Sequence, residues 1–490
     1  AISLRNQCYC KQILNNVKRA TARIQIYMKS NKANSVLNLI FLIVCSMQLT
    51  AQEKPNILII MTDELSAESM SFNLGNQYIN TPNIDQLAKT GVVFSNAYCA
   101  NPLCVPSRSS IFTGRYPHEM GIQSNDEKKV DPTKFPSLGS IFKNAGYATG
   151  YVGKWHLPYE RKVPETHGFD YLPNTTGNGH DSISPQLAND FLKTKRNNPF
   201  LLVVSFMNPH NICQWARGEK LPDGAIGNPP PADQCPPLRP NAKPSVNESD
   251  IMKFMRTSMQ NSDAFPVGAF TEDKWRQYIW SYYRLIEKVD AEIGRVLQSL
   301  KETGKDKNTV IVFTSDHGDM QGAHLWNQKT VFYEEAAKVP FIINYHGLKP
   351  RKSNYLVQSG TDILPTLSDF AGIPVPAQYP GNSLKQYLEK DIAPSNRDYV
   401  VVSDHLIQGV GVDGKDLKPE GRMLRNAQYK YWIYDEGSSR ESLFDLKNDP
   451  GEMINLVNDV RHAKALQECR IQLTEWAKKN NDPYLTKLIK

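Results

Sequence analysis

Short apolar runs recur along the chain, and the segments between them have the end residues of helices. Apolar runs predict buried strands at 56–62 and 200–206, and strands are also predicted at 92–98, 147–152, 309–315 and 339–345. Helices are predicted at 82–90, 107–113, 137–145 and 272–303, since a glycine follows each of them. Thr81 and Thr271 stand at the N-cap positions of the first and last of these helices. The alternation predicts an α/β fold, with a large mixed, mostly parallel sheet and helices on both faces.

The pattern changes after about residue 395. Short polar and aromatic runs at 399–403, 429–434 and 442–446 predict a small antiparallel sheet, and a final helix is expected over about 460–479. We therefore expect a catalytic domain at 52–395 and a smaller C-terminal subdomain at 396–490. Residues 218–246 are rich in proline and glycine and predict a long loop that lies over a site.

The N-terminal segment has the composition of a targeting sequence. Residues 28–51 are expected to be a signal peptide: Lys29 and Lys32 precede an apolar run that ends before the cleavage point at Ala51. The run is shorter than the ~20 residues that cross a bilayer, so we expect a secreted or periplasmic protein without stable membrane insertion. A retained membrane anchor, or a lipid anchor at Cys45, is the alternative. Residues 1–27 are interpreted as an upstream extension that is not part of the native protein.

Charge and cysteine content narrow the function further. The formal charge of +7 arises entirely from seven basic residues in the first 50 positions, so the remaining chain carries equal numbers of basic and acidic residues. Such a chain has no broad positive field, and we expect no nucleic-acid partner. Five cysteines remain after removal of the signal peptide. Cys213 and Cys235 could form a disulfide in an oxidising compartment, which the sequence leaves open.

Unusual polar residues follow the predicted strands. They are Asp63, Glu64, Cys104, Arg108, Lys154, His156, Asn208, His210, Asp316 and His317. Ligands of an open α/β sheet bind outside the carboxyl ends of its strands, so these side chains are expected to converge at one edge. Carboxylates and imidazoles together indicate a metal-assisted hydrolytic site, and hard oxygen ligands favour calcium or magnesium over zinc.

The segment Cys-Val-Pro-Ser-Arg at Cys104–Arg108, followed by Phe112–Arg115, closely resembles the signature of the sulfatase family. Further matches lie at Pro55–Asp63, Gly153–His156, Thr314–Asp319, Lys329 with Tyr333–Glu335, and Leu443–Glu452. The resemblance covers about residues 54–458. It implies a type I sulfatase of the alkaline phosphatase superfamily, similar to the bacterial sulfatases that act on polysaccharides.

In that family the signature cysteine becomes formylglycine, which implies that Cys104 is the nucleophile. The modification implies a partner, either a formylglycine-generating enzyme or an anaerobic sulfatase-maturating enzyme. The resemblance also implies Ca²⁺, with Mg²⁺ as a substitute, bound by Asp63, Glu64, Cys104, Asp316 and His317. Glu64 departs from the family's usual pair of aspartates.

The resemblance also assigns roles in catalysis. Arg108, Lys154 and Lys329 are expected to surround the sulfate with positive charge. His156 is the expected base for sulfate release, and His210 the expected acid for the leaving alcohol. Three further residues are candidates for the substrate pocket, for which a structural role is the alternative: His324, His405 and Arg425.

The expected substrate is a sulfated carbohydrate, namely oligosaccharides derived from sulfated polysaccharide. Two alternatives remain. One is a phosphonate or phosphodiester hydrolase of the same superfamily, and the other is an inactive carbohydrate-binding relative. The second would be expected to have lost Cys104, Arg108 or a metal-binding carboxylate, and none of these is missing.

Overall fold

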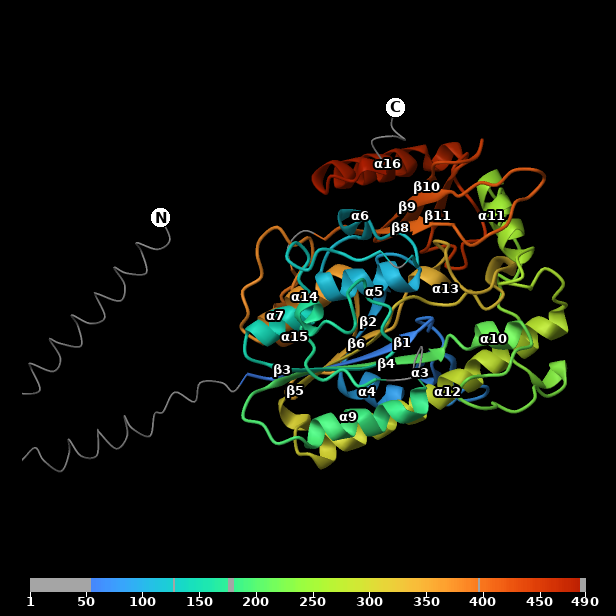
Figure 1. The fold of residues 1–490 in the computed structure, drawn as a ribbon. Coiled ribbons are helices and arrows are strands. Elements are labelled where there is room, and N and C mark those ends of the chain that lie inside the picture. Colours follow the sequence, from blue (N-terminus) through green and yellow to red (C-terminus); the bar gives the residue numbers. More distant parts are fainter. Residues whose placement is uncertain (1–53, 127, 175–179, 395–396, 485–490) are drawn as a thin grey trace, which may run out of the picture. The chain divides into compact units, whose positions relative to one another are not determined.

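The computed structural model describes residues 54–126, 128–174, 180–394 and 397–484 (Figure 1). The predicted signal peptide at 28–51 and the segment 1–27 lie outside the described residues. Within the described ranges, no helix combines the length and the apolar content that crossing a bilayer requires.

A seven-stranded sheet forms the centre of the fold, as the sequence predicts. Its strands run in the order β3-β4-β1-β5-β6-β2-β7. Their bounds are β1 Asn56–Asp63, β2 Val92–Tyr98, β3 Ala148–Gly153, β4 Phe200–Pro209, β5 Thr309–Ser315, β6 Phe341–Asn344 and β7 Arg351–Gln358. Neighbours pair in parallel except at β6, which is antiparallel to both β5 and β2. The sheet is therefore mixed and mostly parallel.

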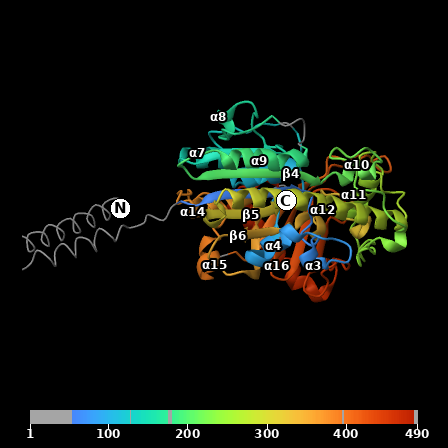
Figure 2. The same cartoon turned by 90° about the horizontal axis from the view of Figure 1, so that it is seen from below.

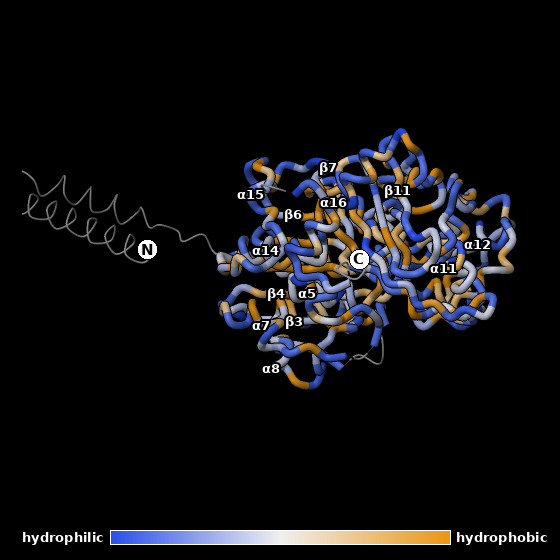
Figure 3. Tube along the Cα trace, turned by 90° about the horizontal axis from the view of Figure 1, so that it is seen from above, coloured by the Kyte–Doolittle hydropathy of each residue, from blue (hydrophilic) through white to orange (hydrophobic). Residues whose placement is uncertain are grey.

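Both faces of the sheet are covered, which explains why its central strands are apolar at every position. Ile57, Ile59 and Met61 of β1 face one hydrophobic core, and Leu58 and Ile60 face the other. The first core contains α5 (Cys104–Thr113), α7 (Leu138–Asn144) and α14 (Ser359–Phe370); the second contains α4 (Pro82–Thr90), α9 (Ser184–Lys193) and α12 (Glu272–Glu302). Figure 1 shows these two layers on opposite sides of the sheet, and Figure 2, seen from below, shows α4, α9 and α12 in front of the strands. In Figure 3, hydrophobic positions concentrate along the inner strands.

Several element boundaries differ from the sequence predictions. The helix expected from Ser107 begins at Cys104, because Pro106 lies within the first turn, where a missing N–H breaks no helical hydrogen bond. The strand expected at 339–345 is shorter, Phe341–Asn344. The Thr81 side chain does not cap α4, since Thr81 Oγ1 donates to Asp85 instead. Thr271 does cap α12, accepting from Lys274 N.

A second sheet follows, with four antiparallel strands in the order β11-β10-β9-β8. Its strands are β8 Tyr399–His405, β9 Glu420–Asn426, β10 Tyr429–Tyr434 and β11 Glu441–Asp445. Alternate side chains of β8 face α16 (Ala463–Lys479) or the hydrophobic core shared with residues 320–337. The final helix begins a few residues later than expected, because 460–462 form a single 3-10 turn. The predicted domain boundary at 395 stays a prediction.

The remaining helices lie at the edges of these layers. They are α3 Ser71–Leu74, α6 Pro117–Met120, α8 Pro164–His167, α10 Ile212–Ala216, α11 Asp250–Gln260, α13 Glu334–Ala337 and α15 Lys385–Lys390. The segment 218–246, predicted to be a long loop, contains only one 3-10 turn, Ala232–Gln234. Arg239 of this loop donates from Nη2 to Gln321 Oε1 at 3.0 Å, in the segment that follows β5.

Candidate active site

The predicted residues meet at the carboxyl edge of the large sheet. Asp63 ends β1, Cys104 is the first residue of α5, Lys154 directly follows β3, and Asp316 directly follows β5. All four side chains are buried. The strand order brings β3, β4, β1 and β5 side by side, so residues more than 200 positions apart come into contact.

Cys104 lies at the centre of this group. Its Sγ is 3.3 Å from His317 Nε2, 3.8 Å from Lys154 Nζ and 3.9 Å from Asp63 Oδ1. As the first residue of a ten-residue helix, Cys104 also lies at the positive end of the helix dipole. The position therefore suits a group that reacts with an anion.

Two carboxylates are locked in place by buried cations. Arg108 donates from Nη2 to Asp63 Oδ2 at 3.0 Å and from Nε to Asp316 Oδ2 at 2.7 Å. Lys154 Nζ forms an ion pair with the same oxygen of Asp63. Arg108 Nη1 also donates to Ser205 Oγ at 2.8 Å, which fixes the guanidinium on the far side. Because Arg108 has no exposed surface, its plane is fully determined by these partners.

Four side chains at this edge could hold a metal ion. One ligand atom from each of Asp63, Cys104, Asp316 and His317 lies within 4.8 Å of the others. His317 directs Nδ1 at the carbonyl of Gly318, 3.0 Å away, which leaves Nε2 facing the group. Carboxylate oxygens and an imidazole nitrogen are ligands of divalent cations. The donor set thus fits the expected metal.

Glu64 lies outside that group. It lies with His210 and Cys213, whose ligand atoms are within 4.8 Å of each other and of its carboxylate. Glu64 Oε2 pairs with Lys329 Nζ at 2.9 Å and accepts from Cys213 Sγ at 3.6 Å. Only the backbone N–H of Glu64 reaches the first group, donating to Asp316 Oδ1 at 3.2 Å. Its assignment as a metal ligand stays a prediction.

The thiols of the two cysteines near α5 differ in acidity. Burial raises the pKa of Cys99 far above its ordinary range. Burial acts on Cys104 in the same direction, but Lys154, Lys329 and His317 outweigh it and hold the pKa of the Cys104 thiol well below its ordinary value. A hydrogen bond from His156 adds to this effect. Of these two cysteines, Cys104 is therefore the one with thiolate character.

The two histidines with expected proton-transfer roles have different neighbours: His156 interacts with Cys104, and His210 lies with Glu64 and Cys213. His210 follows the end of β4, its Nε2 is 3.7 Å from Glu64 Oε2, and 19% of its side chain is exposed. Burial, together with Lys329 and Lys154, lowers the pKa of His210. The Nδ1 atoms of His156 and His210 are buried without a hydrogen-bond partner in the described part of the chain. Both imidazoles thus retain a free nitrogen.

Sequence reasoning missed residues that hold the site together. Ser205 interrupts the apolar run of β4, and that interruption was the available signal for a contact with Arg108. Ser107 Oγ donates to the carbonyl oxygen of Asp316 at 2.5 Å and so ties α5 to β5. Asp319, part of a predicted motif, accepts from Tyr278 OH at 2.9 Å instead of facing the cysteine.

Other residues singled out from the sequence lie in contacts that indicate a structural role. His324 stacks on Tyr333, with ring centroids 3.7 Å apart, and lies near Glu335 and Glu452. Lys430 already pairs with Glu452 at 2.9 Å, so we interpret this group as an ion-pair network. His405 is the last residue of β8 and pairs there with Glu420 of β9. Cys213 and Cys235, which the sequence left open as a disulfide, are both free thiols.

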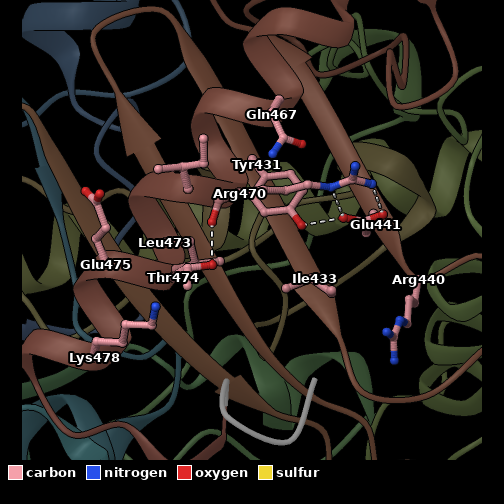
Figure 4. A pocket seen from close by; sticks show the side chains of 11 residues that line it. Tyr431, Ile433, Arg440, Glu441, Gln467, Arg470, Leu473, Thr474, Glu475 and Lys478 are labelled. Carbon is pink, nitrogen blue, oxygen red and sulfur yellow. Dashed lines mark hydrogen bonds and ion pairs between the residues drawn. The ribbon is translucent and has the colours of Figure 1, made fainter. Parts of the chain in front are cut away.

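A groove of about 510 Å³ lies elsewhere, between α16 and strands β10 and β11 (Figure 4). Arg470 forms two hydrogen bonds there with Glu441, at 2.8 and 2.5 Å, and Tyr431 donates to the same carboxylate. None of the predicted site residues lines this groove. The catalytic candidates therefore belong to the sheet edge alone.

Comparisons with known proteins find relatives along most of the chain. Residues 55–373 match the sulfatase family model, and residues 322–479 match the model described as N-sulphoglucosamine sulphohydrolase, C-terminal. A Delta 4,5-hexuronate-2-O-sulfatase from Bacteroides thetaiotaomicron is 33% identical over 90% of this chain and 93% of its own length. An N-acetylglucosamine-6-O-sulfatase from the same organism is 28% identical, over 93% of each chain. The solved structure of a 2-O GAG sulfatase superposes with a TM-score of 0.77 at 31% identity, over 89% of this chain and 94% of that one.

Proposed function

Because this chain belongs to the sulfatase family, we propose that it removes sulfate groups from carbohydrates through a formylglycine made from Cys104 and a bound divalent cation. Hydrolysis of sulfuric esters follows from the family and from its named relatives. The position of Cys104 carries the finer proposal. Its side chain belongs to the set of candidate metal ligands, lies 3.8 Å from Lys154 Nζ and within the influence of the Lys329 charge, and stands at the N-terminus of a helix.

Asp63, Asp316 and His317 are the residues that would hold the cation, with residue 104 beside them. The cation is expected to be Ca²⁺, with Mg²⁺ as a substitute, and when bound it supplies positive charge that acidifies a hydroxyl and binds a sulfate oxygen. Converted to formylglycine, residue 104 supplies a hydrated aldehyde, in which one hydroxyl attacks sulfur and the second allows sulfate to leave. The rest of the chemistry belongs to the surrounding side chains.

Fixed cations orient the sulfate. Lys154 and Lys329 lower the pKa of the unmodified Cys104 thiol, so the positive charges of both lysines act at the position where the nucleophile forms. Preorganised charge of this kind stabilises a developing anion without reorganisation during the reaction. Arg108 acts indirectly: its ion pairs hold Asp63 and Asp316 in the orientation that faces residue 104.

Proton transfers are assigned to the two histidines. His210 is the proposed acid for the leaving alcohol, and its 19% exposed side chain supports this role, because a group that protonates the substrate must be reachable from solvent. His156 is the proposed base for sulfate release, since its hydrogen bond reaches residue 104. Proton transfer of this kind typically contributes about 10²–10⁴-fold to a rate.

Mass spectrometry tests the modification with an internal control. Trypsin should release residues 90–108 as one peptide that contains both Cys99 and Cys104. Conversion of a thiol to formylglycine removes one sulfur and two hydrogens and adds one oxygen. We expect that mass change at residue 104 only, with Cys99 of the same peptide alkylated by iodoacetamide. Active enzyme in which both cysteines are alkylated in every molecule would refute the proposal.

The substrate class is proposed from the activities for which the relatives are named. They act on sulfated hexuronate and N-acetylglucosamine, so sulfated saccharide fragments are the first compounds to assay. A panel of monosaccharides and disaccharides sulfated at single positions, with free sulfate measured by ion chromatography, would identify the position cleaved. An aryl phosphate and an aryl phosphonate in the same panel test the alternative hydrolase, and faster cleavage of these than of every sulfate would favour it.

Export and maturation complete the proposal. The signal peptide expected at 28–51 and the Cys104 motif support a secreted or periplasmic enzyme that meets its maturating enzyme before or during export. Fractionation of cells that express the full chain tests the location. Protein retained in the cytoplasm with its N-terminal segment intact would contradict it.

A further inference from the structure

A buried carboxylate lies behind the end of β4, outside the set of residues that face Cys104. Asp181 is the first residue of the 3-10 turn Asp181–Ile183, and it is 4% exposed. Its carboxylate accepts from Met207 N at 2.6 Å, from Asn208 N at 2.8 Å and from Asn208 Nδ2 at 2.8 Å. All three donors belong to the last residues of β4, directly before the segment that carries His210.

The same peptide units hold His210. Its backbone N–H donates to the carbonyl of Met207 at 3.1 Å, and its own carbonyl accepts from Cys213 N at 3.0 Å. The turn 207–210 is therefore fixed from two sides. Asp181 holds the N–H groups at its start, and α10 (Ile212–Ala216) continues from its end.

Asp181 is itself held from a second direction. Its backbone N–H donates to Asp223 Oδ2 at 3.0 Å, and the other oxygen of Asp223 is 3.3 Å from His180 Nδ1. Lys288 of α12 donates to the carbonyl of Asp223 at 2.6 Å. Burial raises the pKa of Asp181 to about 7, so this carboxylate costs free energy to keep ionised, and its hydrogen bonds to β4 oppose that cost. The network links α12, the loop at 223 and the end of β4.

We propose that Asp181 is a positioning residue for the sulfatase reaction: it holds the turn Met207–His210 so that the His210 imidazole can protonate the leaving oxygen of the substrate. This rests on the acid role proposed above for His210. Misplacement of a reacting group by 1 Å can cost about 10²-fold in rate. In Asp181→Asn, an amide N–H group replaces one accepting oxygen and faces an N–H donor of β4, so the turn must shift.

The chain offers a closely matched control. Asp290 on α12 is 2% exposed and accepts from Asn83 N at 3.2 Å, Ile84 N at 2.8 Å and Asn83 Nδ2 at 2.8 Å. Asp290→Asn therefore disturbs the same kinds of hydrogen bond by replacing one accepting oxygen, but at the start of α4 and not at a strand end that carries a catalytic histidine. It should lower stability without altering the balance between substrates.

The test compares kcat on two substrates whose leaving groups differ. Nitrophenol leaves as a stable anion and needs little protonation, whereas a sugar alcohol needs the proton. We expect Asp181→Asn and His210→Ala both to lose at least about tenfold more on the best sugar sulfate of the panel than on nitrophenyl sulfate. Asp290→Asn should lose equally on both. Melting temperatures of all three variants show which effects come from folding.

Each outcome decides the question. Equal losses for Asp181→Asn on both substrates, while His210→Ala discriminates between them, would overturn the positioning role and leave the proposed function standing. Equal losses for His210→Ala would refute the acid role, and the proposal for Asp181 falls with it. If Asp181→Asn does not fold, Asp223→Ala provides a milder variant, because it removes the support of the Asp181 N–H, together with the contacts of Asp223 with His180 and the Asn208 amide, but keeps the hydrogen bonds from β4 to the Asp181 carboxylate. The same substrate imbalance is expected there at smaller size, and its absence would refute the proposal.

Discussion

Replacing Arg108 by glutamine should destabilise the protein and abolish its activity. The guanidinium is fully buried and serves two carboxylates, Asp63 at 3.0 Å and Asp316 at 2.7 Å, besides its hydrogen bond to Ser205. Glutamine is neutral and shorter, so Asp316 loses its nearest cation while Asp63 keeps Lys154. Removing one partner of a buried ion pair costs about 3–5 kcal/mol. We expect a loss of that size in metal-free protein.

A second buried arginine provides the control. Arg422 in β9 is also without exposed surface and pairs with Asp482 at 2.6 and 3.1 Å, in the C-terminal sheet. Arg422→Gln should therefore lower the free energy of unfolding by a similar amount. It should leave sulfate release per folded molecule unchanged, because none of its hydrogen bonds reaches the edge of the large sheet.

Two measurements separate stability from catalysis. Denaturant unfolding of chelator-treated protein, followed by tryptophan fluorescence, gives the change in stability. Initial rates on nitrophenyl sulfate, measured well below the melting temperature, give the activity of folded protein. A loss of less than about 1 kcal/mol for Arg108→Gln would show that the two carboxylates do not need this cation. Equal activity of the two variants would refute a role for Arg108 in the active site.

Three further results are expected. Chelation should lower the melting temperature and stop turnover, because a cation bound only to the folded state stabilises it; unchanged rates in metal-free protein would contradict the metal site. Burial raises the pKa of Asp404 from 3.8 to about 7, so the folded protein binds this proton more tightly than the unfolded chain. The free energy of unfolding should therefore fall as the pH rises from 4 to 7, by at most about 4 kcal/mol from this group. Asp404→Asn should flatten that slope in pH-dependent denaturation, and an unchanged slope would contradict the assignment. His156→Ala should slow turnover on nitrophenyl and sugar sulfates alike and accumulate sulfated enzyme, detectable by intact mass; its absence at slowed turnover would contradict the base role.

The central sheet could be predicted because its strands are covered on both faces. Strand β1 sends side chains into two different cores, so its sequence is apolar without interruption and its end at Asp63 is sharp. Residues that follow such ends must gather at one edge, whatever their separation in sequence. The contacts of Cys104 with Asp63, Lys154 and His317 follow from this rule.

Strand β9 could not be predicted for the opposite reason. Its sequence, Glu-Gly-Arg-Met-Leu-Arg-Asn, is polar, yet Gly421 to Arg425 are buried. The two arginines are inside because distant residues satisfy them: Asp482 pairs with Arg422, and Tyr98 OH accepts from Arg425 Nε at 3.1 Å. A buried cation with a distant partner has the same local pattern as an exposed one. Only the tertiary structure distinguishes them.

Glu64 shows a similar limit within the site. The motif places Asp63 and Glu64 together at the end of β1, but the extended backbone stops at Asp63, so the two side chains leave it in different directions. Asp63 faces Cys104, whereas Glu64 turns toward Lys329 and Cys213 with a backbone φ of 70°. Each carboxylate therefore pairs with a different lysine: Asp63 with Lys154, and Glu64 with Lys329. A motif can therefore identify which residues reach the edge of the sheet, but the side on which each one acts depends on partners from other strands.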